Sequence, residues 1–220
     1  MLREPSPRLA SLLEGETMDE TIAAALPEWK AIRPLFETWR RFMHECVSFW
    51  PGGGELHTKE HCERVLLHAL TIGVRLGLSA EDLEALSACA VFHDSRRLDD
   101  GRDVGHGQRA SDYYRECSRA AGFAHRDTGT EFDWRVALTI AYHDRDDAEG
   151  ERATKAAAQG ATGAEAALMI YRAFKDADAL DRWRLGPHGL DPAFLRTESA
   201  HQLVDFARRL VGTPPQETSC

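Results

Sequence analysis

Residues 79–94 read SAEDLEALSACAVFHD, and they carry the clearest helix signals in the chain. Ser79 and Asp82 match a capping-box start, with acidic residues in the first turn of a helix. The segment then becomes almost wholly apolar, which is typical of a helix that is buried on all sides. It ends on His93 and Asp94. The stretch therefore predicts a core helix that delivers two metal-capable side chains from the interior.

The rest of the chain has the same helical character. No segment alternates β-branched and aromatic residues between turn signals, so strands are not expected. The sequence therefore predicts an all-α protein. Pro34 should bend or restart the second helix. The expected helices cover residues 17–26, 28–50, 58–78, 79–94, 107–121, 133–143, 164–185 and 193–211, and a mobile polar loop or lid is expected over 144–163.

The domain organisation follows from one strong interruption. The chain of 220 residues is long enough to bury a sizeable core. The sequence PGGGE at 51–55 stops the helical pattern, so we expect an N-terminal helical extension over 1–54, a main helical domain over 55–211 and a polar tail over 212–220. Aromatic residues at helical spacing in the extension indicate that it packs on the main domain, and a homodimer interface is the alternative.

Composition excludes several classes of protein. The formal net charge of -9 would repel a nucleic-acid backbone, so broad nucleic-acid binding is not expected. No apolar run has the length of a membrane span, and the N-terminus lacks the apolar stretch of a secretory signal, so we expect a cytoplasmic protein without a membrane segment. The five cysteines are scattered and never spaced as C-x-x-C, which argues against a disulfide framework or a thiolate zinc site.

Histidines recur on inward helix faces and at helix ends, where a metal ion can collect them. A single buried histidine is more often a hydrogen-bonded core residue than a ligand, so only the set is informative. His61 lies on the inward stripe of its helix with Val65, whereas His57 at the start of that helix is expected to support the ligands. His93 and Asp94 diverge by about 100° on a helix, but at a helix end the backbone can direct both to one ion.

A late carboxylate would complete such a set. Residues 175–181, KDADALD, offer Asp176, Asp178 and Asp181. The apolar phase of this helix does not choose among the three.

Four of these residues resemble a known motif. His61 in HCERV, His93 and Asp94 in AVFHD, and Asp178 in KDADALD are similar to the H…HD…D motif of the HD-domain superfamily of metal-dependent phosphohydrolases. The resemblance covers roughly residues 55–185 in order, spacing and flanking residues. It implies an all-α bundle with the metal at its centre, Asp178 as the last ligand, and His93 with Asp94 as the catalytic pair.

Two further histidines extend the resemblance. Members of the superfamily with two metal ions carry additional histidines after the HD pair, and His106 and His143 stand at the corresponding places. Both are therefore expected ligands, although His106 could instead bind substrate phosphate and His143 could cap its helix. A set of histidine and aspartate without cysteine suits one or two divalent ions, and Mn²⁺, Fe²⁺, Mg²⁺, Ni²⁺ and Zn²⁺ all fit these ligand types.

Arginines are concentrated after the HD pair in a chain that is acidic overall. Guanidinium groups match phosphate oxygens, so Arg97 and Arg109, and then Arg96, are the expected substrate contacts. Lys175 and Arg182 are second choices. The alternative is that the arginines pair with nearby aspartates and make the loop rigid. Asp103 is also expected to accept a proton from a ligating imidazole.

The function that follows is hydrolysis of a phosphate ester of a small molecule, with a nucleotide as the leading substrate. A metal ion would lower the pKa of a bound water and polarise the phosphoryl oxygen. Two other functions stay open on the same residues: a di-iron oxygenase of the HD-like type, and a nucleotide-sensing domain without turnover. The substrate itself is not specified by any pattern in the sequence.

Overall fold

The computed structural model describes residues 22–51, 56–119, 131–158 and 160–212. Within these ranges the chain is helical and contains no strand, so the all-α prediction is confirmed. The predicted start of the first helix, the PGGGE break and the polar tail lie mainly outside the described residues, and the domain division stays a prediction. The helices are α2 (Trp29–Cys46), α3 (Lys59–Arg75), α4 (Ala80–Phe92), α5 (His106–Arg119), α6 (Trp134–Tyr142), α7 (Asp147–Ala157), α8 (Gly160–Leu180), α9 (Glu198–His201) and α10 (Val204–Leu210), with 3-10 helices η1 (Asp181–Leu185) and η2 (Pro192–Phe194).

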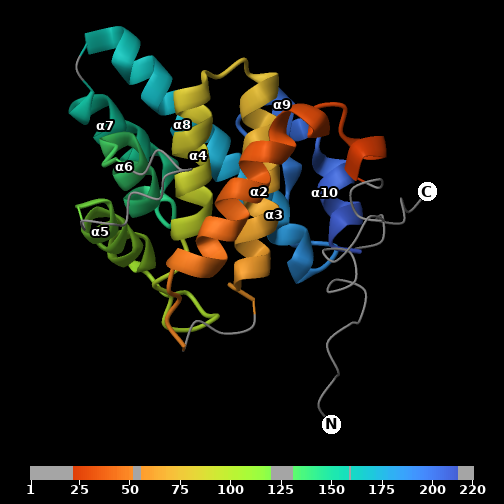
Figure 1. Ribbon diagram of the computed structural model, residues 1–220, viewed down its shortest axis with the longest axis horizontal. Coiled ribbons are helices and arrows are strands. Elements are labelled where there is room, and N and C mark those ends of the chain that lie inside the picture. The colour runs from red at the N-terminus through yellow and green to blue at the C-terminus, as the bar shows by residue number, and fades with distance from the viewer. Residues whose placement is uncertain (1–21, 52–55, 120–130, 159, 213–220) are drawn as a thin grey trace.

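Helices α3 and α4 pack side by side at the centre of the molecule, and α2 crosses in front of them (Figure 1). Every residue of α3 from His61 to Gly73 is buried, and so is the end of α4 from Ala85 to Phe92. Helix α8 packs against both central helices. In Figure 1, α5, α6 and α7 lie on one side of this pair, and α9 and α10 lie on the other. The central helices therefore carry their polar side chains into the interior.

Helix α4 begins as the sequence predicts. The hydroxyl of Ser79 accepts a hydrogen bond from the backbone N–H of Asp82, and the carboxylate of Asp82 accepts one from the backbone N–H of Ser79. This reciprocal cap satisfies donors that a helix start leaves without partners. The helix ends on His93, its C-cap residue, so the next residue, Asp94, leaves the helix axis.

Helix α2 ends earlier than predicted, and of the two outcomes expected at Pro34, a bend or a restart, the restart does not occur. The helix ends at Cys46 rather than near residue 50, because the ammonium group of Lys59 donates to the carbonyl oxygens of Met43 and His44 and satisfies the helix end. Pro34 lies inside the helix and does not restart it. The buried residues of α2 continue on both sides of Pro34 along one stripe, and their packing on α3 and α4 keeps the helix continuous.

Two predictions for the second half of the chain were wrong. The expected loop over 144–163 contains α7, because Asp146 caps the helix at Ala148 and the alanine-rich segment after it has high helix propensity. The expected single helix over 193–211 is instead broken into η2, α9 and α10. The break lies at Thr197, whose hydroxyl caps α9 and also donates to the buried carboxylate of Asp176.

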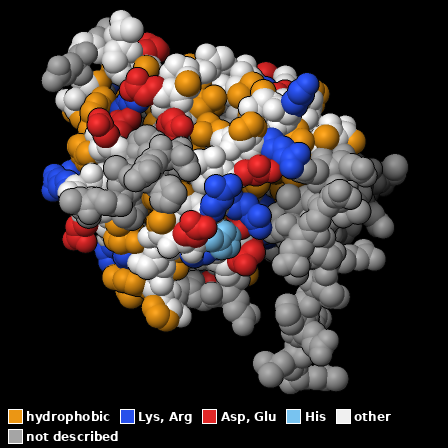
Figure 2. Space-filling model, in the orientation of Figure 1, with side chains coloured by type: hydrophobic (Ala, Val, Ile, Leu, Met, Phe, Trp, Pro, Cys, Tyr) orange, Lys and Arg blue, Asp and Glu red, His pale blue; other side chains and the backbone are white. Residues whose placement is uncertain are grey.

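The face of the molecule on which α2 lies carries both positive and negative side chains. Figure 2 shows basic and acidic side chains next to one another there, with apolar atoms between them. Among the residues that the structure describes, no helix combines the length and the apolar character that crossing a bilayer requires.

The buried imidazole of His68 should make stability sensitive to acid. Neither ring nitrogen has a hydrogen-bond partner among the described residues, and burial lowers the pKa of His68 to about 4. The unfolded chain then binds the proton more readily, so the stabilising contribution is present above about pH 6.5 and is lost as the pH falls toward 4. With a chelator present, the loss of unfolding free energy between about pH 7.5 and 5 should be roughly 2 kcal/mol smaller in His68→Leu.

Urea unfolding at the two pH values measures this difference. The matched control is His201→Leu, which removes an exposed imidazole from α9. An equal pH response in wild type and His68→Leu would contradict the prediction.

Candidate metal centre

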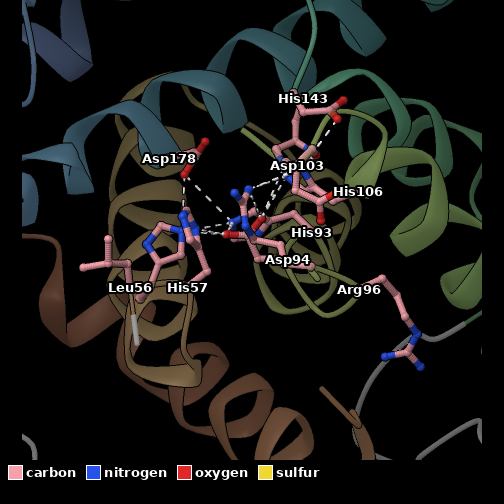
Figure 3. Close-up of polar contacts among 12 residues, drawn as sticks. Leu56, His57, His93, Asp94, Arg96, Asp103, His106, His143 and Asp178 are labelled. Atoms are coloured by element: carbon pink, nitrogen blue, oxygen red, sulfur yellow. Dashed lines mark hydrogen bonds and ion pairs between the residues drawn. The ribbon is translucent and has the colours of Figure 1, made fainter. Parts of the chain in front are cut away.

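Five helices deliver the predicted ligands to one place in the core. Three of them contribute from their ends, where α4 finishes, α5 begins and α6 finishes. Figure 3 shows the labelled ligands converging on the carboxylate of Asp94. The contributions are His61 from α3, His93 and Asp94 from the end of α4, His106 from α5, His143 from the end of α6 and Asp178 from α8.

The first ligand set joins α3, α4 and α8. The Nε2 atom of His61 lies 3.1 Å from Nε2 of His93, 3.4 Å from Oδ2 of Asp94 and 3.4 Å from Oδ1 of Asp178. The Nε2 atom of His93 lies 3.6 Å and 3.9 Å from the same two oxygens. Ligands about 2.1 Å from one ion lie about 3.4 Å apart in tetrahedral geometry. The ligand atoms of His61, His93 and Asp178 therefore lie close enough together to hold one ion, and Oδ2 of Asp94 lies within 3.6 Å of both imidazoles.

The second set uses the other oxygen of Asp94. Its Oδ1 atom lies 3.1 Å from Nε2 of His106 and 3.6 Å from Nε2 of His143, and these two nitrogens are 2.9 Å apart. One carboxylate thus faces two groups of imidazoles. Asp94 also belongs, with His93 and His143, to a group of side chains that could hold a metal ion.

Hydrogen bonds orient each of the four imidazoles. In every case an acceptor lies against Nδ1, so Nδ1 donates its hydrogen and Nε2 faces the centre. The acceptors are a carboxylate once and backbone carbonyl oxygens three times. The pairs are His61 with Asp181 at 2.7 Å, His93 with Ala90 at 2.9 Å, His106 with Asp103 at 2.6 Å and His143 with Ile140 at 2.7 Å.

These residues fit a metal ion on two observations. In each set two imidazole Nε2 atoms face one another, and either a shared proton or a cation must lie between such lone pairs. In addition, Oδ1 of Asp94 is buried and has no hydrogen-bond partner among the described residues. A cation between the imidazoles would satisfy this oxygen as well as the lone pairs. The cluster can therefore hold a metal ion, and it is compatible with the H…HD…D arrangement that the sequence resembles.

The charge balance of the cluster depends on the carboxylates. Burial alone would lower the pKa of His61, but hydrogen bonds with Asp178, Asp181 and Asp94 outweigh it and raise that pKa to about 10. Burial lowers the pKa of His93 to about 3, which keeps this ring in the neutral form that binds metals. Burial opposes ionisation of Asp178, yet the hydrogen bond with His61 and the field of His93 hold its pKa far below the usual range.

Support for His61 comes from a buried ion pair that the sequence did not identify. The Asp181 carboxylate is fully buried and accepts two hydrogen bonds from Arg64, from Nε at 2.5 Å and from Nη2 at 3.0 Å. Burial opposes its ionisation, but His61 and Arg64 lower the pKa of Asp181 to about 2. The sequence offered Asp181 only as an alternative ligand. Asp181 follows Asp178 by three residues, which is about one helical turn. This spacing indicates that the two carboxylates lie on the same side of the chain, and it could have identified Asp181 as a supporting residue.

His57 lies closer to the centre than its position at a helix start suggested. It is half-buried, and its Nδ1 atom lies 2.7 Å from Oδ2 of Asp94. Arg184, from η1, lies 3.4 Å from the same nitrogen. His57 is thus in contact with the Asp94 carboxylate, and with His61 and Asp94 it forms a group that could itself hold a metal ion.

Of the three predicted substrate arginines, the structure brings only Arg97 to the centre. Its Nη1 atom lies 3.0 Å from Nε2 of His106 and 3.7 Å from Oδ1 of Asp94. Arg96 points away from the cluster in Figure 3, because it donates to the carbonyl oxygen of Ser48 at 2.6 Å and stacks on Tyr113. The expected contact between Arg96 and substrate is therefore not supported by the geometry.

Arg109 is also held outside the pocket. Its guanidinium group pairs with the carboxylate of Asp103 and donates to the carbonyl oxygen of Arg96. This is the loop-stabilising alternative. The carboxylate of Asp103 is consequently occupied, and it is the backbone carbonyl of Asp103 that accepts the proton of His106.

The ligands open on a cavity of about 400 Å³. Arg97, Lys175 and Arg182 line it as expected. Sequence reasoning missed other members of the wall, because they come from turns whose direction depends on packing. These are Asp144, Arg145 and Arg184, whereas Arg102, which also lines the pocket, is one of the arginines concentrated after the HD pair.

A close approach at Gly107 places His106 beside His143. A Cβ atom at Gly107 would lie 2.6 Å from the carbonyl oxygen of Ile140 and 3.0 Å from Nδ1 of His143, so Gly107→Ala must separate α5 from α6. We expect destabilisation by about 1–3 kcal/mol and a lower metal content, because His106 and His143 are moved apart. Chemical unfolding and metal analysis measure the two effects.

The control for this change is Gly163→Ala, because a Cβ atom there meets nothing within 4 Å. It should leave metal content unchanged. Retention of both ions in Gly107→Ala would show that the helix approach does not determine the second set.

Comparisons of the chain with protein families, curated proteins and solved structures gave no significant match. The site is therefore interpreted from its own residues.

Proposed function

We propose that this protein is a metal-dependent phosphohydrolase of the HD-domain type, acting on a phosphate ester of a small molecule, with a nucleotide as the leading substrate. The observation that supports the proposal best is the position of Asp94, whose two oxygens face separate groups of imidazoles beside a pocket with basic walls. A divalent ion held by His61, His93, Asp94 and Asp178 would supply a Lewis acid for the phosphoryl oxygen and lower the pKa of water.

The chain's own residues have separate roles in this proposal. Arg97 presents its guanidinium group beside Asp94 and His106, where a phosphate oxygen can accept from it. Lys175 donates to the carbonyl oxygens of His143 and Arg145, and this anchors its positive charge at the pocket wall. These two cations would hold the phosphate group against the ligand cluster. Asp181 would keep His61 oriented during turnover.

A substrate and metal screen tests the proposal. Purified protein is first analysed for bound metal and then assayed on phosphomonoesters and phosphodiesters with Mn²⁺, Fe²⁺, Mg²⁺, Ni²⁺ or Zn²⁺. Turnover should require the metal, disappear with a chelator and return when the metal is restored. His61→Gln should lose it, and Glu198→Gln, an exposed change on α9, should retain it. Stoichiometric metal without hydrolysis of any ester would reject the proposal.

A di-iron oxygenase is the second candidate function, because two imidazole-rich sets that share Asp94 also suit a pair of iron ions. Anaerobic reconstitution with iron followed by oxygen-uptake measurements separates the two. Substrate-dependent oxygen consumption, together with the spectrum of a mixed-valent iron pair, would favour the oxygenase. Metal binding with neither activity would favour the sensing domain.

A further inference from the structure

The wall of the pocket carries more positive charge than one phosphate group needs. Six basic side chains and five carboxylates line it, which leaves a formal charge of +1, and each divalent ion would add two. The chain as a whole has a net charge of -9, so this local excess does not follow from composition. A positive pocket in an acidic protein favours a ligand with several negative charges.

Three of the six basic side chains are already paired with carboxylates. In each pair a nitrogen of the basic side chain lies 3.2 to 3.7 Å from a carboxylate oxygen. All three pairs lie close to the ligand cluster or to the helices that carry it. The pairs are Arg97 with Asp94, Lys175 with Asp147 and Arg184 with Asp181. Their charge is partly balanced within the protein.

The other three, which we term the outer arginines, are Arg102, Arg145 and Arg182. All three are exposed, and no carboxylate among the described residues lies within ion-pair distance of any of them. Arg182 donates to the carbonyl oxygen of Gly189, and Arg145 stacks on Tyr142. The outer arginines come from the loop after α4, the turn after α6 and η1, yet they line the same pocket.

We propose that the outer arginines form a second anion-binding subsite at the pocket mouth, so that the substrate carries two separated anionic groups. One group is the phosphate at the ligand cluster, and the other, a second phosphate or a carboxylate, accepts hydrogen bonds from the outer arginines. The inference rests on the proposed function for the first group only. Exposed aliphatic side chains of Leu56, Val104 and Leu185 also line the pocket and can contact the part of the substrate that joins the two anions.

Paired ligands of equal length test this subsite without turnover. Metal-loaded protein, freed of excess metal, is titrated calorimetrically with propylphosphonate and propane-1,3-diphosphonate, and with the corresponding pentane compounds. At least one diphosphonate should bind about tenfold more tightly than its monophosphonate, because a charge-assisted contact contributes that much. The combined change Arg102→Gln, Arg145→Gln and Arg182→Gln should lower this ratio about fivefold or more. Metal analysis after each titration excludes removal of the ion by the ligand.

The control carries the same loss of charge at exposed arginines outside the pocket: Arg41→Gln, Arg152→Gln and Arg209→Gln. It should keep the preference for the diphosphonate. Equal affinity of mono- and diphosphonates, absence of phosphonate binding, or an equal fall of the ratio in both triple variants would overturn the subsite. A preference for the diphosphonate in a protein that hydrolyses no ester would retain the subsite and reject the proposed hydrolase. Turnover without the preference would do the reverse.

Discussion

Asp94→Asn should release metal from both ligand sets at once and lower phosphohydrolase turnover by a factor on the order of 10³. The reason is that the two oxygens of Asp94 serve different sets, one near His61 at 3.4 Å and the other near His106 at 3.1 Å. Asparagine keeps the shape of the side chain, but it removes the negative charge and replaces one oxygen by a donor. Elemental analysis of the purified variant measures the metal content.

Single-set variants make this prediction specific. His106→Gln should lose the second ion and retain the first, whereas His61→Gln should weaken the first, so neither should match Asp94→Asn. Asp112→Asn, an exposed change on α5, is the control for charge removal. Circular dichroism confirms folding of each variant. If Asp94→Asn keeps its full complement of metal, the carboxylate does not bridge the two sets.

Arg64→Met should destabilise the protein by about 3–5 kcal/mol, since it removes the two-pronged hydrogen bonds and the charge of Arg64 from the buried carboxylate of Asp181. The change should also lower the affinity for the first metal ion about 10- to 100-fold, because Asp181 holds Nδ1 of His61. Urea unfolding in a chelator measures the first effect, and metal titration measures the second. Arg64→Lys keeps the charge but loses the two-pronged contact, and we expect an intermediate result.

A double variant separates the ion pair from simple packing. Asp181→Asn added to Arg64→Met removes both charges, and the stability should recover by at least about half of the loss. The carbonyl of asparagine can still accept the proton of His61, so part of the metal affinity should return as well. A loss below about 1 kcal/mol in Arg64→Met would show that the pair contributes little.

Much of the fold was predictable, because helix signals are local. The cap at Ser79 and Asp82 is made within one turn, and the apolar run after it requires burial wherever the helix lies. The errors lie where distant partners decide. Lys59 ends α2 early by bonding its last carbonyls, and Asp176 holds Thr197, which divides the expected last helix.

In the site, too, the position of a residue along its helix was predictable, whereas the direction of its side chain was not. His93 and Asp94 could be placed at the end of a buried helix from the sequence, and the structure brings His61 and Asp178 to them. Arg96 lies only one residue from Arg97, yet it stacks on Tyr113 and leaves the pocket. The direction of the Arg96 side chain depends on Tyr113 of α5 and on the carbonyl oxygen of Ser48, in the chain after α2.

An all-α chain with metal-capable residues at the ends of buried helices could be predicted from local patterns, because periodicity, capping and residue chemistry act within a few residues. Three features became visible in the three-dimensional structure alone. The two oxygens of Asp94 face different groups of imidazoles, Asp181 contacts His61 although 120 residues separate them in the chain, and the outer arginines line one pocket. These depend on how α3, α4, α5, α6 and α8 pack. Packing joins side chains far apart in the chain, and no local pattern records which of them will meet.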